Sequence, residues 1–166
     1  MKPTLAHARL LELVSYDPDT GVFTNRISRA KRALAGAVCG APNKLGYIDI
    51  RIEGLRVLAH RLAWFYVYGE WPRHEIDHID GDPTNNRIAN LRDVPHAHNQ
   101  QNVKLRGSAT TGLPGAYRVG SRFKAMISVG GKTRHIGYFD TAEAAHAAYV
   151  AAKRAAHPGF VDRMAV

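Results

Sequence analysis

Residues 75–102 read EIDHIDGDPTNNRIANLRDVPHAHNQQN, and the first half of the chain is interpreted outward from this stretch. An adjacent carboxylate and imidazole, Asp77 and His78, precede a turn of Gly, Asp, Pro and Asn, then Asn90, then a tail rich in amides and histidines. The pattern is typical of a short β-turn-β-helix unit. Acid, base and amide ligands spaced along such a unit favour metal-assisted chemistry on a phosphate ester.

Other interpretations of the same residues fit less well. Residues 74–78 match H-E-x-x-H, the zinc-protease motif, which needs a helix long enough to place both histidines on one face. Pro72 before the motif and Gly81-Asp82-Pro83 after it leave room for two turns at most. A calcium loop is disfavoured because the required Gly and the final Glu are missing from DGDPTNN. A polar surface loop without chemistry is the remaining alternative.

The charge of the chain indicates a polyanionic partner. Its 166 residues carry a formal net charge of +9, and the sequence pI is about 10.0. Residues 20–47 and 94–139 contain no Asp or Glu, although a solvated basic face would also explain such runs. Cys39 is the single cysteine, so an internal disulfide is excluded and a reducing, intracellular compartment is expected. The first residues contain no long apolar run, so no signal peptide or membrane anchor is expected.

The N-terminal part is predicted to mix short helices and strands. Apolar spacing indicates a helix from Thr4 to Val14, followed by a turn at 16–21 and a strand at 22–24. Residues 26–42 are basic and rich in small residues, which is typical of a loop that could lie along a nucleic-acid backbone. Residues 46–58 alternate around Glu53-Gly54 and predict a β-hairpin.

A buried helix is expected next. Residues 59–68 are apolar on most sides and are followed by Gly69, a typical helix end. His60 and Arg61 are polar in this core-like segment. For His60, a structural role with satisfied hydrogen bonds is favoured over a phosphate contact.

The C-terminal part has a different pattern. Residues 103–115 are polar and glycine-bearing, as in a linker between modules. Three alternating strands follow at 116–119, 122–129 and 132–139, joined by two-residue glycine turns. Thr141 is the expected N-cap of an Ala-rich helix that Pro158-Gly159 ends.

The central stretch resembles the HNH homing endonucleases found in phages, which have a ββα-metal fold. The resemblance spans roughly residues 60–102 and rests on four segments in order: Asp77-His78-Ile79-Asp80-Gly81, Asn85-Asn86-Arg87, Asn90-Leu91-Arg92 and His98-Asn99. It implies that His78 is the general base, for which a neutral imidazole is suited. It further implies that Asp77 and Asn99 bind one divalent ion, Mg²⁺ or Mn²⁺, which prefers oxygen ligands.

Two points of this site stay open. The resemblance implies that Asn90 ties the long turn through backbone hydrogen bonds. The first open point is the further metal ligand, for which His96 and His98 are alternatives to Asn99. The second concerns strand geometry. Adjacent residues of a regular strand point to opposite faces, so Asp77 and His78 can share a site only if the strand ends or bulges there.

The C-terminal part resembles the APETALA/ethylene-response-factor DNA-binding domain. The resemblance covers about residues 111–160 and rests on Gly115-Ala116-Tyr117-Arg118, Phe123-Lys124-Ala125, the run 136–145 and Ala148-Tyr149. It implies a sheet that enters the major groove of DNA. The matching DNA-binding candidates are Tyr117, Arg118, Arg122, Lys124, Lys132 and Arg134.

Together these features predict an α+β protein: a small ββα-metal nuclease domain preceded by a β-hairpin and helix, then a three-stranded antiparallel sheet packed on one helix. The expected bounds are 1–104 for the nuclease domain, 105–111 for a linker and 112–160 for the DNA-binding domain. The expected activity is divalent-metal-dependent hydrolysis of double-stranded DNA by a monomer or homodimer in a bacterial or phage-infected cell, with no membrane or nucleotide cofactor. A non-catalytic DNA-binding protein with a vestigial nuclease fold is the alternative.

Overall fold

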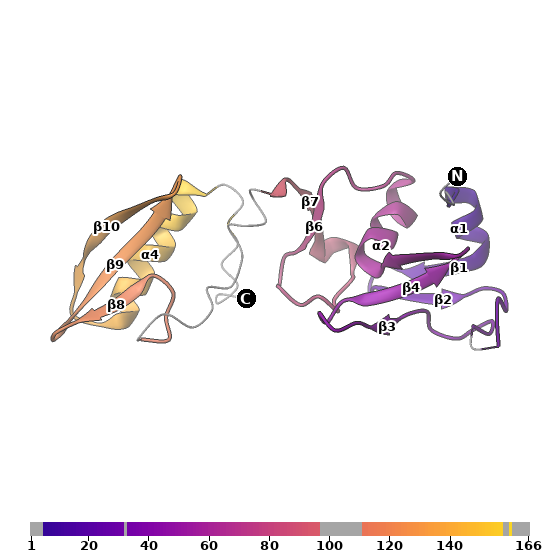
Figure 1. Cartoon of the computed structure of the whole chain (residues 1–166), viewed down its shortest axis with the longest axis horizontal. Coiled ribbons are helices and arrows are strands. Elements are labelled where there is room, and N and C mark those ends of the chain that lie inside the picture. The colour runs from indigo at the N-terminus through magenta and orange to yellow at the C-terminus, as the bar shows by residue number, and fades with distance from the viewer. Residues whose placement is uncertain (1–4, 32, 97–110, 158–159, 161–166) are drawn as a thin grey trace. The chain divides into compact units, whose positions relative to one another are not determined.

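The computed structural model describes residues 5–31, 33–96, 111–157 and 160, and the following statements concern these residues. The chain divides into two compact units, residues 1–95 and 96–166 (Figure 1). The predicted boundaries near 104 and 111 fall within or beside residues 97–110, which lie outside the described residues. No helix in the described part of the chain is long and apolar enough to cross a membrane.

The N-terminal unit combines short helices with three small antiparallel sheets, β1-β2, β3-β4-β5 and β6-β7 (Figure 1). Its elements, in chain order, are α1 (His7–Leu13), β1 (Val14–Asp17), β2 (Val22–Asn25), β3 (Ala41–Pro42), β4 (Ile48–Ile52), β5 (Leu55–Leu58), α2 (Ala59–Tyr68), β6 (Glu75–His78), the 3-10 turn η1 (Ile88–Asn90) and β7 (Leu91–Val94).

The first helix differs from its prediction. Helix α1 begins at His7, with Ala6 as its cap, and it ends at Leu13. Val14, expected as the last helical residue, instead opens β1 and pairs with Asn25 of β2. Val14 and Tyr16 are buried on one side of this hairpin, so pairing and burial prevail over the helical spacing.

Helix α2 and the β4-β5 hairpin agree with their predictions, whereas the turn predicted at 16–21 begins only after Asp17 of β1 and the loop predicted at 26–42 ends in β3. Helix α2 covers the expected residues and ends in a left-handed Gly69, with φ of 74°. The β4-β5 hairpin turns through Glu53 and Gly54, whose φ angles are 48° and 76°. Positive φ at both positions matches the right-handed twist of a two-residue hairpin.

The core of the N-terminal unit joins its helices to its sheets. Leu10 and Leu13 of α1, Phe23 of β2, Ile50 of β4 and Leu62 of α2 are almost completely buried in one cluster. Their burial fixes the position of α2, which directly precedes the segment leading to β6. The core therefore positions the elements that carry the candidate site.

The C-terminal unit is a three-stranded antiparallel sheet, in the order β10-β9-β8, with one helix packed against it (Figure 1). The bounds are β8 (Ala116–Val119), β9 (Arg122–Val129), β10 (Lys132–Phe139) and α4 (Ala142–Ala156), and the three strands have the predicted bounds. Thr141 caps α4 as predicted, because its hydroxyl accepts a hydrogen bond of 3.1 Å from the Ala144 amide.

Small residues let the helix approach this sheet closely. Ala116, Ala125 and Ala145 are fully buried at the contact. Gly115 has φ of 74°, and a Cβ there would lie 2.1 Å from the Tyr149 ring. A glycine is therefore required where β8 begins.

Candidate functional site

Strand β6 carries Asp77 and His78 at its end, and β7 covers one side of it. In the register of this pair, Asp77 faces Arg92 and His78 faces Leu91. Arg92 donates hydrogen bonds from Nε and Nη2 to Oδ2 of Asp77, at 3.0 and 2.6 Å. Asp77 is only 5% exposed, so this ion pair compensates a buried carboxylate.

His78 is held by the loop that connects the two strands. Its Nε2 lies 3.2 Å from Oδ1 of Asn86, and both residues are buried. The Asn86 amide nitrogen donates to the Thr84 carbonyl at 3.0 Å, which assigns the oxygen of that side chain to His78. An amide oxygen only accepts, so Nε2 of His78 carries the proton. Nδ1 then carries the lone pair of the neutral ring.

Asp77 and His78 contact different partners because strand alternation sends them to opposite faces. The pairing of β6 with β7 is regular through His78, where the strand ends. The Ile79 amide then donates to the Asn90 carbonyl at 2.9 Å and leads the chain into the loop. Both residues thus belong to the regular strand, which ends directly after His78, and a metal site shared by them stays a prediction.

Two further rings contact His78. The His60 ring of α2 meets it edge-on, with centroids 5.0 Å apart and an angle of 87° between the planes. Tyr47 lies 5.3 Å from His60 and 6.0 Å from His78, centroid to centroid. His60 is 5% exposed, which agrees with the structural role favoured for it. Its contact with the candidate base was not predicted, and no spacing in the sequence signals it.

Both histidines are held in the neutral form. Burial, together with the smaller effects of the His78 and Arg61 charges, lowers the pKa of His60 to about 3. Burial also lowers the pKa of His78, against the opposing effect of its hydrogen bond to Asn86 and of nearby carboxylates such as Asp80. A neutral His78 at pH 7 can accept a proton.

Asn90 makes the backbone hydrogen bonds that were expected of it. Its Oδ1 accepts from the Asp80 amide at 3.1 Å, and its Nδ2 donates to the Asn85 carbonyl at 2.8 Å. The same nitrogen donates to the Asp80 carboxylate at 3.0 Å. Asn90 thereby ties both ends of the loop that carries Asn86, and its part in catalysis stays a prediction.

The N-terminal hairpin supports this loop from outside. The Tyr16 hydroxyl donates to the Asn86 carbonyl at 2.7 Å. Gly21, with φ of 75°, approaches the loop so closely that a Cβ would lie 2.5 Å from the Arg87 amide nitrogen. These contacts join residues that are far apart in the sequence, and local patterns did not predict them.

The donor set fits a hard divalent ion in part. Asp77 offers a buried carboxylate, whereas the expected partner Asn99 and its rival His98 lie outside the described residues. His96 is exposed at the edge of the described part. Over residues 5–31, 33–96, 111–157 and 160, three or more His, Cys, Asp or Glu side chains do not converge on one point.

The H-E-x-x-H match is a coincidence of sequence. His74 precedes a strand, and its half-exposed ring lies 3.4 Å from Asp93. His78 is buried at the far end of β6, so no helical face carries both histidines.

The six DNA-binding candidates of the C-terminal unit do not share one face of its sheet. Directly opposite residues of antiparallel strands lie on the same face. Arg118, Lys132 and Arg134 pair with Phe123, Val129 and Ile127, which pack toward α4. By the same alternation, the outer face carries Tyr117, Arg122 and Lys124. Three of the six candidates therefore lie on each face of the sheet, and their part in DNA binding stays a prediction.

A β-bulge in β10 brings Tyr138 to the outer face, beside His135. The register shifts between His135 and Gly137, so Ile136 packs into the core. His135 and Tyr138 then both lie on the outer face, with ring centroids 4.8 Å apart. Simple period-two alternation would have placed these two residues on opposite faces.

Residues 57–101 match the family model described as HNH endonuclease. This stretch is similar to the HNH endonucleases. The matched segment contains α2 with His60, the β6-β7 pair and the loop between them. It supports a nuclease of the HNH type, as the sequence indicated. In the comparisons with curated proteins and with solved structures, nothing matches the chain.

Proposed function

We propose that this protein is a divalent-metal-dependent DNA endonuclease of the HNH homing type. The supporting observation is the buried, neutral His78 next to the Asp77 carboxylate, within the segment that matches the HNH endonuclease family. Asp77, His78 and Asn90 are the site residues on which the proposal rests in the described part of the chain. Asn99 is proposed with them from the sequence resemblance.

His78 acts as the general base in this proposal. Nδ1 of His78 removes a proton from the water that attacks the scissile phosphate, while Nε2–H stays bonded to Oδ1 of Asn86. The imidazolium that forms is stabilised by that amide oxygen and by the nearby Asp80 carboxylate. Asn86 thus keeps the ring in one tautomer and one orientation throughout the step.

Asp77 and Asn99 would hold one Mg²⁺ or Mn²⁺ ion through oxygen ligands. When bound, the ion neutralises charge on the phosphate and stabilises the departing 3′ oxygen. Arg92 orients the Asp77 carboxylate through its two hydrogen bonds. Binding of the ion requires Asp77 to serve both Arg92 and the metal, or to exchange one for the other.

The C-terminal sheet serves as a DNA reader in this proposal, as an APETALA/ethylene-response-factor-like domain would. The outer face, with Tyr117, Lys124 and the His135–Tyr138 pair, is the face that would meet base edges and backbone. Arg118, Lys132 and Arg134, at the rim of the sheet, would contact the phosphates on either side of the DNA groove.

A plasmid nicking assay with Mg²⁺ or Mn²⁺ tests the nuclease. We expect wild-type protein to cut and His78→Ala to lose about 10²–10⁴-fold in rate, the usual contribution of general acid–base catalysis. His74→Ala is the matched control, because it removes a histidine outside the site. Mapping the products on both strands distinguishes nicking from double-strand cutting.

The alternative is a DNA-binding protein without activity. If wild-type protein binds duplex DNA but cuts it no faster than His78→Ala does, the nuclease proposal is wrong. Equal loss of activity in His74→Ala would assign the effect to folding and would also remove the support for His78 as the base.

A further inference from the structure

A large groove lies on the N-terminal unit, apart from the residues of the candidate nuclease site. It runs between the loop 29–45 and the strands β4 and β5, and its volume is about 1300 Å³. Four cationic side chains are among its lining residues: Arg29, Lys44, Arg51 and Arg56. Its acidic lining residues are Asp49 and Glu53.

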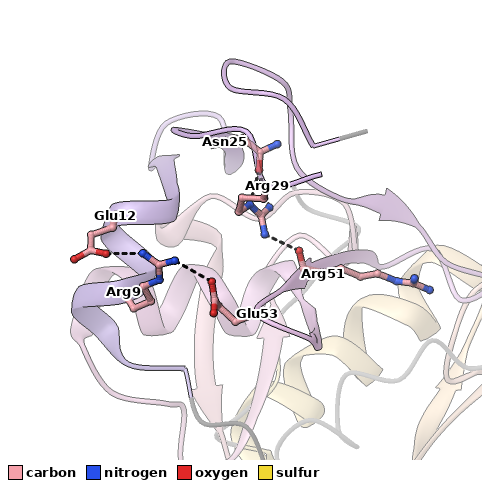
Figure 2. Close-up of polar contacts among 6 residues, drawn as sticks. All are labelled: Arg9, Glu12, Asn25, Arg29, Arg51 and Glu53. Atoms are coloured by element: carbon pink, nitrogen blue, oxygen red, sulfur yellow. Dashed lines mark hydrogen bonds and ion pairs between the residues drawn. The ribbon is translucent and has the colours of Figure 1, made fainter. Parts of the chain in front are cut away.

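The two acids are already neutralised by arginines. Asp49 forms an ion pair with Arg56 across the hairpin, which lowers the pKa of Asp49. Glu53 accepts from Arg9 of α1 at 3.3 Å, and Arg9 also bonds Glu12 (Figure 2). The acidic groups therefore contribute little net negative charge to the groove.

Two cations of the groove remain available for a ligand. Arg29 is occupied, since it donates to Asn25 and to the Arg51 carbonyl (Figure 2). The side chains of Lys44 and Arg51 are exposed and form no ion pair within the described part of the chain. In Figure 2 the Arg51 guanidinium extends away from Arg9 and Glu53.

The register of β4 and β5 adds a second, independent indication of an anion. Arg51 lies directly opposite Arg56, so two like charges face each other on one side of the hairpin. Such pairs destabilise a sheet. The Asp49 carboxylate forms an ion pair with Arg56 and also feels the charge of Arg51, so one carboxylate serves two guanidinium groups. A bound anion would relieve this repulsion. The adjoining run 20–47 contributes no Asp or Glu that could do so.

The groove is formed before any ligand arrives. Arg29 clamps the loop through Nε to Oδ1 of Asn25 at 3.0 Å and through Nη1 to the Arg51 carbonyl at 3.0 Å. At Gly40, with φ of 95°, a Cβ would lie 2.9 Å from the Asp49 carbonyl oxygen, so loop and strand are in close contact. A preformed surface loses less conformational entropy on binding.

We propose that this groove binds the sugar-phosphate backbone of the DNA that the nuclease acts on, with Lys44 and Arg51 each neutralising one phosphate. The inference rests on the proposed function for the identity of the polyanion. Leu45 and Val38, which are 78% and 68% exposed in the groove lining, supply apolar contacts to sugars. The groove gives the nuclease unit an affinity for DNA that is separate from that of the C-terminal sheet.

Salt-dependent binding by the full-length chain tests this proposal. The parent is His78→Ala, which is not expected to cut, and fluorescence anisotropy with a 30-base-pair duplex is measured in EDTA over a series of NaCl concentrations. Adding Lys44→Ala and Arg51→Ala should weaken binding and reduce the salt slope by about 1.8, or about 0.9 for each lost phosphate contact. Lys31→Ala is the matched control, because Lys31 is an exposed lysine of the same loop that does not line the groove.

The possible outcomes separate this inference from the proposed function. A parent that binds no duplex DNA refutes both. If the parent binds and the double variant has the same salt slope as the parent, the groove proposal alone is refuted. It is also refuted if Lys31→Ala has an equal effect, because binding would then depend on net charge and not on a local contact. If the double variant loses the parent's binding to polyglutamate but keeps its binding to DNA, the groove would be assigned to an acidic protein and the proposal would be overturned.

Discussion

The buried His60 makes a quantitative prediction for the pH dependence of stability. Its pKa is about 3 in the folded protein, against about 6.5 for an exposed histidine. The unfolded state therefore binds one more proton than the folded state between these two pH values. The contribution of the neutral His60 ring to the free energy of unfolding is fully present above pH 6.5, and it is lost as the pH falls from 6.5 toward 3.

The size of the effect follows from these two pKa values. Between pH 7 and pH 5, one such histidine lowers the free energy of unfolding by about 2 kcal/mol. His60→Phe keeps a ring against Tyr47 and His78 but removes the titrating group. We expect wild-type protein to lose about 2 kcal/mol more than this variant over that pH interval.

Urea unfolding followed by tryptophan fluorescence measures this difference. Trp64 and Trp71 are the two tryptophans of the chain, and both lie in the N-terminal unit, so the signal reports on that unit. His135→Phe, in the C-terminal unit, is the control and should follow the wild-type curve. If wild type and His60→Phe differ by the same free energy at pH 7 and pH 5, His60 is not buried as a neutral ring and the reasoning fails.

Three other predictions concern the loop, the ion pair and the outer face of the C-terminal sheet. Asn90→Ala removes three hydrogen bonds and should lower the free energy of unfolding by about 1–3 kcal/mol, as measured by urea unfolding; a loss below about 0.5 kcal/mol would contradict its role as the loop tie. Arg92→Met removes the ion pair from the buried Asp77 carboxylate and should cost on the order of 3 kcal/mol, most of which Asp77→Asn should restore in the double variant; additive losses would count against the pair. Tyr117→Ala with Lys124→Ala should weaken duplex binding in anisotropy without lowering the melting temperature by more than a few degrees, and unchanged binding would remove the outer face from the proposed reader.

Local chemistry explains why the sequence alone predicted much of the fold. The strand bounds of the C-terminal unit follow from two-residue glycine turns, and α4 begins where the Thr141 hydroxyl can cap it. Gly69 ends α2 for a similar reason, because a left-handed residue stops the helix there. Each of these signals acts over two to four residues, so neighbouring letters are enough to identify it.

The candidate site was predicted only in part. The order Asp77, His78, Asn90 indicated a nuclease-like loop, and the hydrogen bonds of Asn90 agree with its expected place in that loop. The ring of His60 against His78 was not predicted, because the two residues are brought together by the core cluster that α2 shares with β6 and β7. In the sequence, His60 is one polar residue in an apolar helix, and nothing local tells which neighbour it meets.

Tertiary structure also decided which residues share a face. Val14 is part of a helical pattern in the sequence, yet it opens a strand because β2 offers a pairing partner and the core offers burial. The bulge at Ile136 shifts Tyr138 to the face of His135, which alternation from the sequence would have separated. The stretch 75–102 therefore determined by itself the class of chemistry to expect, from its types of side chain and their order. The tautomer of His78 depends on the Asn86 side chain in the folded loop, and its buried neutral state and ring neighbours depend on contacts between distant segments, so only the folded chain determined them.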